Sequence, residues 1–397
     1  MNPADAQRVI EALRIGLPPD GYVCHFTVGR KSEIDQLNAR LNGSQKGALL
    51  LKANYGSGKS HLLRFLKERA LEEGYVVSSV TLDARSAVRF NRMDQILGAI
   101  WRSIEIPNDH RQKGLRPFLN IICNEIEKSK SQNTACFWKD LTNNWKWDLS
   151  SVLEAPAFFI ALRAWSTGAN EARDLVQDWL YQPWTYTSQR RALYTKLVEQ
   201  LRNYFRDPRP DWKFYSDGIF NFQLQGYSQC WATLRDIDKI SIAAGYKGLI
   251  ILFDEFEDVI HNIKNINHKE AAFWNLFDFY MGKEFKGMTY FAVTPDFTRK
   301  CKQLLLQKGR YDYDYSIFDK LPTFEMSPLT AEELKELATR ILEVHGTANN
   351  WEPDLMMKMS ELKAMVAKTA SVQVQDRARQ TIKEIVKYLD KHLEDLE

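Results

Sequence analysis

Short runs of apolar residues recur along the chain and predict the buried strands of a parallel sheet. Each run is rich in aliphatic or β-branched side chains and ends at or just before a polar residue. A strand that is covered on both faces shows such a continuous run, whereas a half-exposed strand alternates apolar and polar residues. The runs lie at residues 47–52, 75–82, 249–253 and 287–293, and residues 317–324 are the candidate for a last strand.

Apolar residues at helical spacing predict helices between these strands. One helix follows the first strand and ends near Gly74, and another covers about residues 93–104, which completes a βαβ-like unit. Residues 271–281 are aromatic at helical spacing and are expected to pack in the core.

Both ends of the chain are also predicted to be helical. Residues 4–15 and 32–41 form two amphipathic helices, the second with Ser32 as its expected N-cap. Near the other end, Thr330 and Glu333 have the spacing of a capping box. The chain then continues as a small all-α bundle, with further helices at 353–368 and 376–393.

A long segment separates the second predicted strand from the third. About 195 residues lie between Lys59 and Asp254, whereas one or two βα units of about 30 residues each would bridge them. Helical periodicity predicts an inserted subdomain, with helices at 119–126, 156–165 and 190–205 and a loop at 207–210. Eight of the eleven tryptophans lie here; they are either core residues or contacts to single-stranded nucleic acid or protein. They are Trp138, Trp145, Trp147, Trp165, Trp179, Trp184, Trp212 and Trp231.

The turn after the first strand contains glycines and opens a helix, which is the setting of a phosphate-binding loop. Residues 53–60, Ala-Asn-Tyr-Gly-Ser-Gly-Lys-Ser, match G-x-x-x-x-G-K-S except for Ala53 in place of the first glycine. Gly56 and Gly58 can adopt positive φ and direct N–H groups inward at a helix N-terminus. Lys59 would reach the β- and γ-phosphates of ATP, and the Ser60 hydroxyl would ligate Mg²⁺. The predicted nucleotide-binding residues are Asn54, Tyr55, Gly56, Ser57, Gly58, Lys59, Ser60 and His61.

The third apolar run ends in two acidic residues, Asp254 and Glu255. A buried parallel strand delivers acids at its carboxyl end in this way. Asp254 would hold Mg²⁺ through water, and Glu255 would polarise the water that attacks the γ-phosphate. The alternative is an ordinary strand before a charged helix start, because acidic residues favour a helix N-terminus. Glu257 and Asp258 are assigned to that first helical turn.

Three further features resemble AAA+ ATPases of the origin-recognition type. The segment Val28-Gly29-Arg30 resembles the box that covers the nucleotide base in these proteins, which makes Arg30 a binding candidate; the alternative is a simple packing helix. In such folds a polar residue after a core strand senses the γ-phosphate, and Thr294 holds that place unless it only caps a turn. Arg310 is the candidate for an arginine finger, although its basic neighbours also fit a solvated face.

These motifs define the predicted fold and its domains. The fold class is α/β: a P-loop NTPase with an AAA+-like parallel sheet core, a large helical insertion and a C-terminal all-α lid. The predicted boundaries are 1–45 for the N-terminal helical segment, 46–106 and 246–325 for the two parts of the core, 107–245 for the insert and 326–397 for the lid.

The arrangement is similar to the BREX-associated ATP-binding proteins of the BrxD kind. The resemblance rests on the helix at 6–17 with its Pro18-Pro19 turn, the Val28-Gly29-Arg30 box, residues 52–61, residues 244–255 and the Thr294-Pro295 pair. It implies a role in bacterial or archaeal phage defence, with ATP and Mg²⁺ as cofactors and other defence-system proteins as partners. In this family a Pro-Arg dipeptide opens a helix near the C-terminus. Arg379, with Ala378 for the proline, is therefore the sensor 2 candidate that reaches the γ-phosphate, and Arg377 is the alternative.

Composition sets the expected environment. The net charge is only +3, so no large electrostatic footprint identifies a nucleic acid partner. The five cysteines are odd in number and lack C-x-x-C spacing, as expected for reduced thiols in a cytosol rather than a zinc knuckle. Because we find neither a leader pattern nor an apolar run near 18 residues, we expect a cytoplasmic protein with no membrane contact.

The predicted function is an AAA+-type ATPase in which ATP hydrolysis with Mg²⁺ drives a switch or motor in phage defence. The similarity to origin-recognition ATPases makes double-stranded DNA or DNA-bound proteins the expected target, and a homo-oligomer is compatible with this function. An alternative from another class is a nucleotide-gated scaffold or binding module with marginal turnover. A P-loop kinase is a third candidate, which the helical insert, the C-terminal bundle and Thr294 disfavour.

Overall fold

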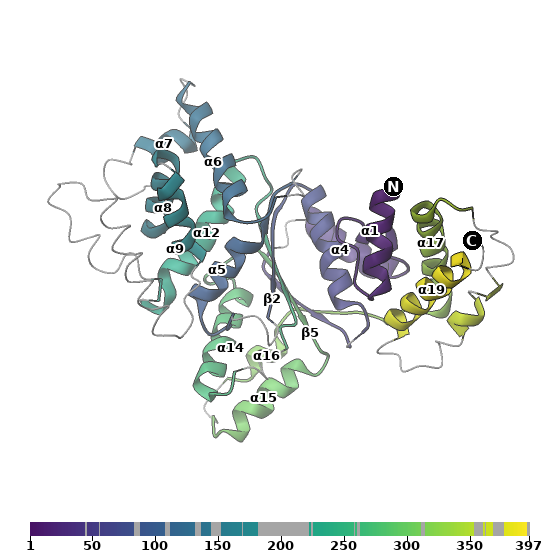
Figure 1. The fold of residues 1–397 in the computed structure, drawn as a ribbon. Helices are drawn as coiled ribbons and strands as arrows, with labels where there is room; N and C mark the ends of the chain where they lie inside the picture. Colours follow the sequence, from purple (N-terminus) through teal and green to yellow (C-terminus); the bar gives the residue numbers. More distant parts are fainter. Residues whose placement is uncertain are drawn as a thin grey trace.

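A six-stranded sheet lies at the centre of the molecule, with helices on both of its faces (Figure 1). The computed structural model describes the chain at residues 1–43, 46–54, 56–82, 88–107, 112–131, 136–143, 152–168, 170–181, 222–223, 225–257, 259, 263–310, 314–352, 360–361, 363–367 and 377–394. Among these residues we find no helix with the length and apolar character needed to cross a membrane.

The sheet is almost entirely parallel and has the strand order β3-β2-β4-β5-β1-β6. Only β3 runs antiparallel, beside β2 at one edge. The four apolar runs predicted as strands are confirmed, whereas 317–324 is mostly not strand, because α16 (Ser316–Asp319) takes up its first residues. The strands are β1 (Ala48–Lys52), β2 (Val76–Thr81), β3 (Ile104–Glu105), β4 (Leu249–Asp254), β5 (Met288–Val293) and β6 (Thr323–Glu325). This mixed α/β sheet is consistent with the core of a P-loop ATPase.

Alternation along the central strands supplies both faces of the core. In β4, Leu249, Ile251 and Phe253 pack on one face of the sheet, while Ile250 and Leu252 pack on the other. Successive side chains of a strand point to opposite faces, so a strand that is covered on both sides must be apolar throughout. The continuous apolar runs are therefore sufficient to locate these strands.

The helices on one face of the sheet come mostly from the long segment between β2 and β4. They form one hydrophobic cluster with that face, and the opposite face is covered by α3 (Lys31–Asn42) and α4 (Lys59–Glu72). The helices of the larger cluster are α5 (Met93–Ser103), α6 (Leu115–Lys130), α7 (Phe137–Asn143), α8 (Pro156–Thr167), α9 (Asn170–Tyr181), α12 (Ser228–Ala243), α14 (Ile266–Tyr280), α15 (Phe297–Gln307) and α16. The predicted helices at 119–126 and 156–165 fall within α6 and α8.

The tryptophans of the insert that the structure describes are core residues. Trp138, Trp165, Trp179 and Trp231 are at most 6% exposed. Their ring faces are covered by neighbouring side chains, so these four do not form a stacking platform for nucleic acid bases. The rest of this prediction lies outside the described residues, namely Trp145, Trp147, Trp184, Trp212, the helix at 190–205 and the loop at 207–210.

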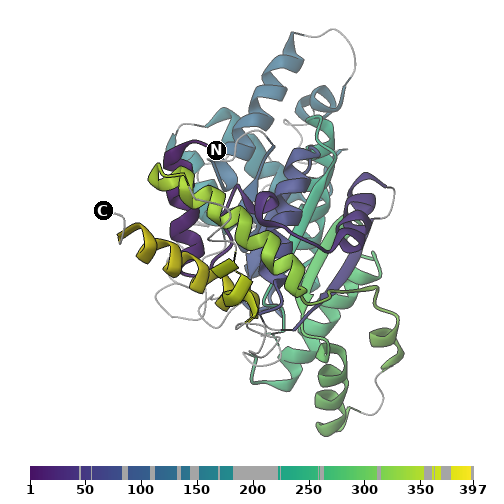
Figure 2. The same cartoon turned by 90° about the vertical axis from the view of Figure 1, so that its right-hand side faces the viewer.

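Helices from the two ends of the chain form a module of their own, which we call the lid module. In it, α1 (Pro3–Arg14) packs against α17 (Ala331–Asn349) and α19 (Arg377–Glu394), and the three helices share a hydrophobic cluster. Figure 2 shows the lid module in front of the rest of the molecule. The N-terminal helix and the C-terminal helices thus bury their apolar faces against one another.

The helix ends follow the local sequence in one case and depart from it in another. The predicted capping box is present at α17, where Thr330 Oγ1 accepts a hydrogen bond from Glu333 N and Glu333 Oε2 accepts one from Thr330 N at 2.7 Å. The N-cap expected at Ser32 is wrong, because α3 begins at Lys31 after Arg30, whose φ is 50°. The helix expected at 376–393 corresponds to α19, and most of 353–368 lies outside the described residues.

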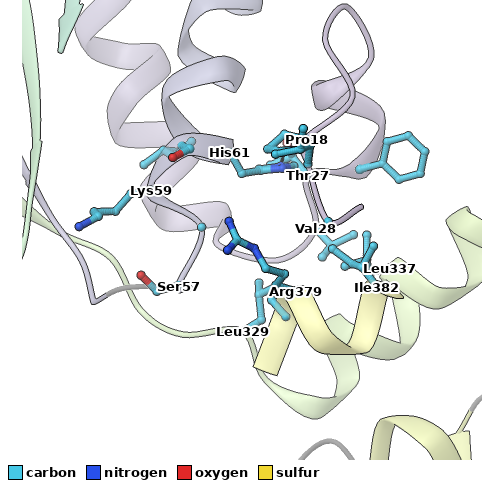
Figure 3. A pocket seen from close by; sticks show the side chains of 18 of the residues that line it. Pro18, Thr27, Val28, Ser57, Lys59, His61, Leu329, Leu337, Arg379 and Ile382 are labelled. Carbon is cyan, nitrogen blue, oxygen red and sulfur yellow. Dashed lines mark hydrogen bonds between the residues drawn. The ribbon is translucent and has the colours of Figure 1, made fainter. Parts of the chain in front are cut away.

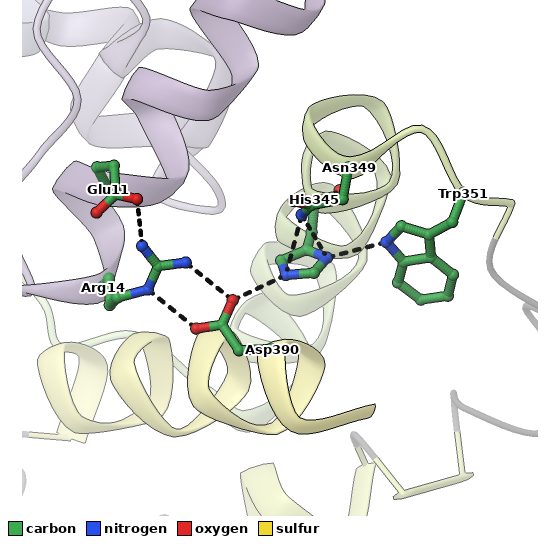
Figure 4. A network of polar contacts seen from close by, with 6 residues as sticks. All are labelled: Glu11, Arg14, His345, Asn349, Trp351 and Asp390. Carbon is green, nitrogen blue, oxygen red and sulfur yellow. Dashed lines mark hydrogen bonds and ion pairs between the residues drawn. The ribbon is translucent and has the colours of Figure 1, made fainter. Parts of the chain in front are cut away.

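A polar network joins the three helices of the lid module (Figure 4). Arg14 on α1 donates two hydrogen bonds of 2.9 Å to the carboxylate of Asp390 on α19. His345 on α17 contacts Asp390 Oδ1 through Nε2 at 3.1 Å, and its Nδ1 accepts a hydrogen bond of 3.1 Å from Trp351 Nε1. Because Nδ1 accepts, the proton of the neutral ring lies on Nε2, which donates to Asp390. A bidentate arginine–carboxylate contact of this kind fixes orientation as well as distance, so it sets how α19 lies against α1.

Candidate functional site

A cavity of about 410 Å³ lies at the carboxyl edge of the sheet and is lined by both the sheet region and the lid module. Its size is that of ordinary ligand pockets. The strand order explains its position, because β5 lies between β1 and β4 and the carboxyl ends of these parallel strands meet at one edge. The loop after β1 and the acids after β4 therefore reach the same space.

The loop between β1 and α4 has the backbone that its glycines predict. Gly56 and Gly58 have φ values of 70° and 98°, a region that glycine adopts without steric penalty. Gly58 is the N-cap of α4, so the N-terminus of this helix lies at the cavity, where a helix favours an anion. Ala53 keeps the strand pairing, because its N–H donates to the Val293 carbonyl at 3.0 Å and its methyl group is buried.

Most of the predicted nucleotide-binding residues line this cavity. Those that do are Arg30, Gly56, Ser57, Gly58, Lys59, Ser60 and His61. Asn54 is exposed and does not line it; its carbonyl oxygen accepts hydrogen bonds from the N–H and the hydroxyl of Ser57, at 3.2 and 2.5 Å. Tyr55 lies outside the described residues.

Lys59 takes part in a buried ion pair that the sequence did not predict. Its Nζ lies 2.5 Å from Oε1 of Glu257, and the two side chains are 8% and 4% exposed. Glu257, which the sequence pattern assigns with Asp258 to a first helical turn, lies in the turn after β4, where it is buried and lines the cavity; Asp258 lies outside the described residues. The lysine expected to reach the phosphates thus contacts a carboxylate within the same cavity.

The turn after β4 brings three carboxylates to the cavity. Asp254, Glu255 and Glu257 line it, whereas Phe256 is buried in the aromatic core. Glu255 has a φ of 54°, which is uncommon for a residue other than glycine, and its N–H donates to Asp254 Oδ1 at 2.9 Å. Phe256 N–H then donates to the Ala292 carbonyl of β5 at 3.2 Å. This sharp turn lets acids on both sides of a core aromatic residue face the same space.

Thr294 directly follows β5, beside both motif strands, but it does not line the cavity. It is 7% exposed. The pKa of Asp296 is lowered, chiefly by a hydrogen bond from Lys300 and also by one from Thr294. The structure therefore places the sensor 1 candidate at the expected edge of the sheet but not among the residues that line the cavity.

Arg30 links the loop to the lid module. Its Nη2 donates to the carbonyl oxygen of Ser57 at 2.6 Å, and its backbone N–H contacts Glu333 Oε1 on α17 at 3.4 Å. Burial lowers the pKa of Arg30, while the charges of Glu33 and Glu333 act in the opposite direction. A β-carbon at Gly58 would lie 3.3 Å from Arg30 Nη1, so this glycine also makes room for the guanidinium.

His61 in the first turn of α4 is neutral and has a defined tautomer. Its Nε2 lies 2.9 Å from Thr27 Oγ1, and the Thr27 hydroxyl donates to the Val23 carbonyl at 2.9 Å. A hydroxyl has one proton to donate, so His61 Nε2 must be the donor to Thr27. Burial, followed by the charges of Arg30 and Arg64, lowers the pKa of His61 to about 4.

Two arginines at the start of α19 lie near the loop. Arg379 lines the cavity, and Figure 3 shows its guanidinium extending from α19 toward the loop. Arg377 borders a small adjoining pocket together with Gly56 and Ser57. Both sensor 2 candidates therefore approach the loop from the lid module.

Arg310, the arginine-finger candidate, does not line the cavity. Its Nη2 lies 2.6 Å from Asn267 Oδ1 and 3.1 Å from Glu270 Oε2 on α14.

Apart from Val28, which belongs to the predicted base-covering box, the apolar wall of the cavity was not predicted from the sequence. Residues from the N-terminal segment, α17 and α19 meet there, and each has the spacing of an ordinary helix-packing or loop residue in the sequence. They include Leu13, Leu17, Pro18, Phe26, Val28, Leu329, Leu337 and Ile382. The sequence around Glu257 contained an ambiguous signal. Glu255 and Glu257 flank the apolar Phe256, and this alternation fits an extended segment with both acids on one side as well as it fits a helix start.

The residues present fit Mg²⁺ that arrives with a nucleotide. Ser60 and Asp254, which supply hard oxygen ligands, both line the cavity. Mg²⁺ usually keeps several waters and takes one or two carboxylates together with substrate phosphates. Within the described ranges, no group of three or more His, Cys, Asp or Glu could hold a metal by itself. The donor set therefore suits a shared protein–nucleotide site.

The parallel sheet, the loop at the N-terminus of α4 and the acids after β4 are together consistent with a P-loop ATP-binding protein. A family model described as BREX system ATP-binding protein BrxC/D matches residues 1–202 and 226–396. The chain belongs to this family. The resemblance that the motifs indicated is thus confirmed, and ATP is the ligand that this membership supports. A comparison with curated proteins found no match.

Proposed function

We propose that the chain is an AAA+-type ATPase that binds and hydrolyses ATP with Mg²⁺ to drive a conformational switch or motor. One observation carries this proposal: a single cavity is lined by Lys59 and Ser60 of the loop, Asp254 and Glu255 after β4, and Arg379 of the lid module. Phosphoryl transfer needs positioning and charge stabilisation more than covalent chemistry, and these residue types supply both.

Each of these residues has a separate role in the proposal. Lys59 contacts the β- and γ-phosphates, Ser60 and Asp254 hold the metal site, and Glu255 polarises the attacking water. Ser60 and Asp254 would hold Mg²⁺ together with the nucleotide, and its charge would offset the negative charge that develops on the phosphates. Arg379 contacts the γ-phosphate from the lid module, and Thr294 acts through the water as sensor 1.

The adenine base is proposed to lie against the apolar wall of the cavity. Val28, Leu337 and Ile382 come from three different segments of that wall, two of them in the lid module. Val28 also packs in the hydrophobic cluster of the lid module, so a base bound there would contact the lid side while its phosphates contact the loop after β1. Such contacts couple nucleotide state to lid position, because a ligand shifts a conformational equilibrium by its differential affinity for the two states.

The biological setting of the proposal rests on the family. A BREX system ATP-binding protein would act in phage defence, in the cytoplasm, with other proteins of that system. Double-stranded DNA or DNA-bound proteins remain the proposed target, and a homo-oligomer the proposed assembly. The burial of Trp138, Trp165, Trp179 and Trp231 makes these four unsuitable as the DNA contact.

A nucleotide-gated binding module is the second candidate function, in which turnover is marginal. The contacts of Arg310 favour it, because an arginine held on α14 by Asn267 and Glu270 is not offered to a neighbouring active site. In that case bound ATP would set a conformation that an effector reads, and hydrolysis would only reset it.

Steady-state ATPase assays with and without double-stranded DNA distinguish the two functions. We expect turnover well above background in at least one condition, and a loss of at least about 100-fold in Lys59→Ala and Glu255→Gln, because each removes charge stabilisation or water activation. Glu255→Gln should still bind ATP, since it leaves the loop intact. Normal hydrolysis by Glu255→Gln would contradict the role given to this residue.

A further inference from the structure

The Lys59–Glu257 ion pair has no role in the proposed reaction. The two groups are in contact at 2.5 Å, both side chains are less than 10% exposed, and both residues line the cavity. Figure 3 shows the Lys59 side chain extending away from Arg379 and thus away from the lid side of the cavity. In the structure, the lysine that should contact phosphate is held by a carboxylate.

The carboxylate that holds Lys59 is itself only partly satisfied. Oε1 of Glu257 contacts Nζ of Lys59, but Oε2 is buried and has no hydrogen-bond partner among the described residues. Removing two charges from water is costly, and the attraction between them compensates fully only when all polar atoms are paired. The ion pair is therefore an arrangement that a strong competing anion can displace.

The backbone keeps Glu257 in this position independently of Lys59. Phe256, the preceding residue, is fully buried. Its ring centroid lies 4.6 Å from that of Phe90 and 4.7 Å from that of Phe291. Its N–H is also bonded to the Ala292 carbonyl of β5. Glu257 is thus presented to the cavity from a rigid element, whereas the lysine side chain is long and can rotate.

From this geometry we infer that Glu257 is a positioning residue that holds the Lys59 ammonium in the nucleotide-free site and competes with nucleotide phosphates for it. The inference rests on the proposed function of Lys59 as the phosphate-contacting residue. If Glu257 holds the lysine in most molecules, only the remaining fraction can bind nucleotide directly. The apparent affinity for nucleotide is then the intrinsic affinity multiplied by that fraction.

The same geometry predicts a dependence on Mg²⁺. When Lys59 turns to the phosphates, the buried Glu257 carboxylate remains close to their negative charge. A divalent cation at the phosphates offsets this repulsion. The penalty that Glu257 imposes on nucleotide binding should therefore be largest when Mg²⁺ is absent.

The test measures ADP binding by titration calorimetry, in EDTA and in Mg²⁺, for the wild-type chain and Glu257→Gln. We expect Glu257→Gln to bind ADP on the order of tenfold more tightly in EDTA, with a smaller gain in Mg²⁺. If Glu257 had a purely structural role, Glu257→Gln would bind ADP more weakly than wild type. If Glu257 were a metal ligand, the variant would bind ADP more weakly in Mg²⁺. Unchanged or weaker binding in EDTA would therefore overturn the inference.

Two matched comparisons separate the ion pair from other effects. Glu255→Gln removes the same charge from the same cavity without touching Lys59, so it should give a clearly smaller gain in EDTA. In a Lys59→Ala background, Glu257→Gln should give no gain beyond that of Glu255→Gln, because a double-mutant cycle isolates the coupling of the two side chains. If both comparisons gave the same gain as Glu257→Gln in the wild-type chain, the pairing would be contradicted.

A milder substitution keeps the inference testable if Glu257→Gln does not fold. Glu257→Asp retains the charge but shortens the side chain by one methylene, so it should give an intermediate gain in ADP affinity. Because the readout is ADP binding, a chain that binds ADP but shows no gain refutes only this inference. A wild-type chain that binds no nucleotide refutes both this inference and the proposed function.

Discussion

At the scale of single residues, the cavity is defined by polar groups that folding removes from water. His61 donates to Thr27, Arg30 donates to the Ser57 carbonyl, and Lys59 contacts Glu257. Each contact joins the loop or α4 to a segment distant in sequence. Pairing offsets the cost of burying polar groups, so these contacts anchor Ser57, Lys59 and His61 to those distant segments.

The depressed pKa of His61 predicts a pH dependence of stability. Its folded-state pKa is about 4, against an ordinary value near 6.5, so between these values the unfolded chain binds a proton that the folded chain does not. This contribution is complete above pH 6.5 and is lost as the pH falls toward 4. When the pH is lowered from 7.5 to 5, we expect the free energy of unfolding to fall by about 2 kcal/mol more in wild type than in His61→Gln. Urea unfolding midpoints measure this difference.

The control for this experiment is His268→Gln, which alters an exposed histidine on α14. It should lose the same stability as wild type over this pH range. The explanation would be wrong if His61→Gln and wild type had parallel pH profiles, because then the His61 imidazole would titrate alike in both states.

At the scale of elements, the segment between α1 and α3 is held from both sides. From α4, the Glu68 carboxylate accepts the N–H groups of Val23 and Cys24 at 3.0 and 2.9 Å. From α17, Arg340 donates to the carbonyls of His25 and Thr27 at 2.6 and 3.1 Å. This segment therefore links the lid module to α4, the helix that begins at the loop after β1.

The bidentate contact between Arg14 and Asp390 is predicted to set the position of Arg379. Asp390 lies eleven residues after Arg379 on α19, about three helical turns, so both are on one face of the helix. Asp390→Ala should speed amide hydrogen exchange in α19 and weaken ATP binding several-fold. The physical reason is that α19 loses its link to α1, whose C-terminal end also lines the cavity.

Glu11→Ala is the matched variant for this prediction, because Glu11 contacts the same Arg14 from within α1. A pair three residues apart on one helix is worth only a few tenths of a kcal/mol, so this change should leave both readouts near wild type. Equal effects of Glu11→Ala and Asp390→Ala would show that the link between helices does not matter.

At the scale of the whole molecule, the cavity lies where two separately packed parts meet. One hydrophobic cluster belongs to the lid module and two cover the faces of the sheet. The proposed nucleotide would contact residues of both parts, and ATP, ADP and an empty cavity would then favour different lid positions. Movement at such a boundary costs less than movement within a close-packed core.

The motor version of the proposed function predicts a nucleotide-dependent assembly. The cavity receives Arg30 and Arg379 from its own chain, while Arg310 is engaged with α14, so an arginine finger would have to come from a second chain. Mass photometry with ATP, with ADP and without nucleotide, each with and without double-stranded DNA, should show a larger species with ATP. A monomer in every condition would contradict the motor and favour the binding module.

The sequence by itself determined the strands, the glycine-containing loop after β1 and the family. The strands and the loop depend on residues close together in the chain: apolar runs for β1, β4 and β5, a run rich in β-branched residues for β2, and glycines before Lys59 for the loop. Local patterns of this kind survive in sequence because backbone geometry and strand burial constrain neighbouring residues directly.

Only the tertiary structure decided which distant side chains meet. Nothing local distinguishes Glu257 from a helix-opening acid, and nothing in α1 indicates that it packs with α17 and α19. Lys59 and Glu257 are 198 residues apart in the chain, and they meet because the sheet order places β4 near the start of α4. Contacts over such separations arise from packing of whole elements, which is why the ion pair and the lid module became visible only in the folded chain.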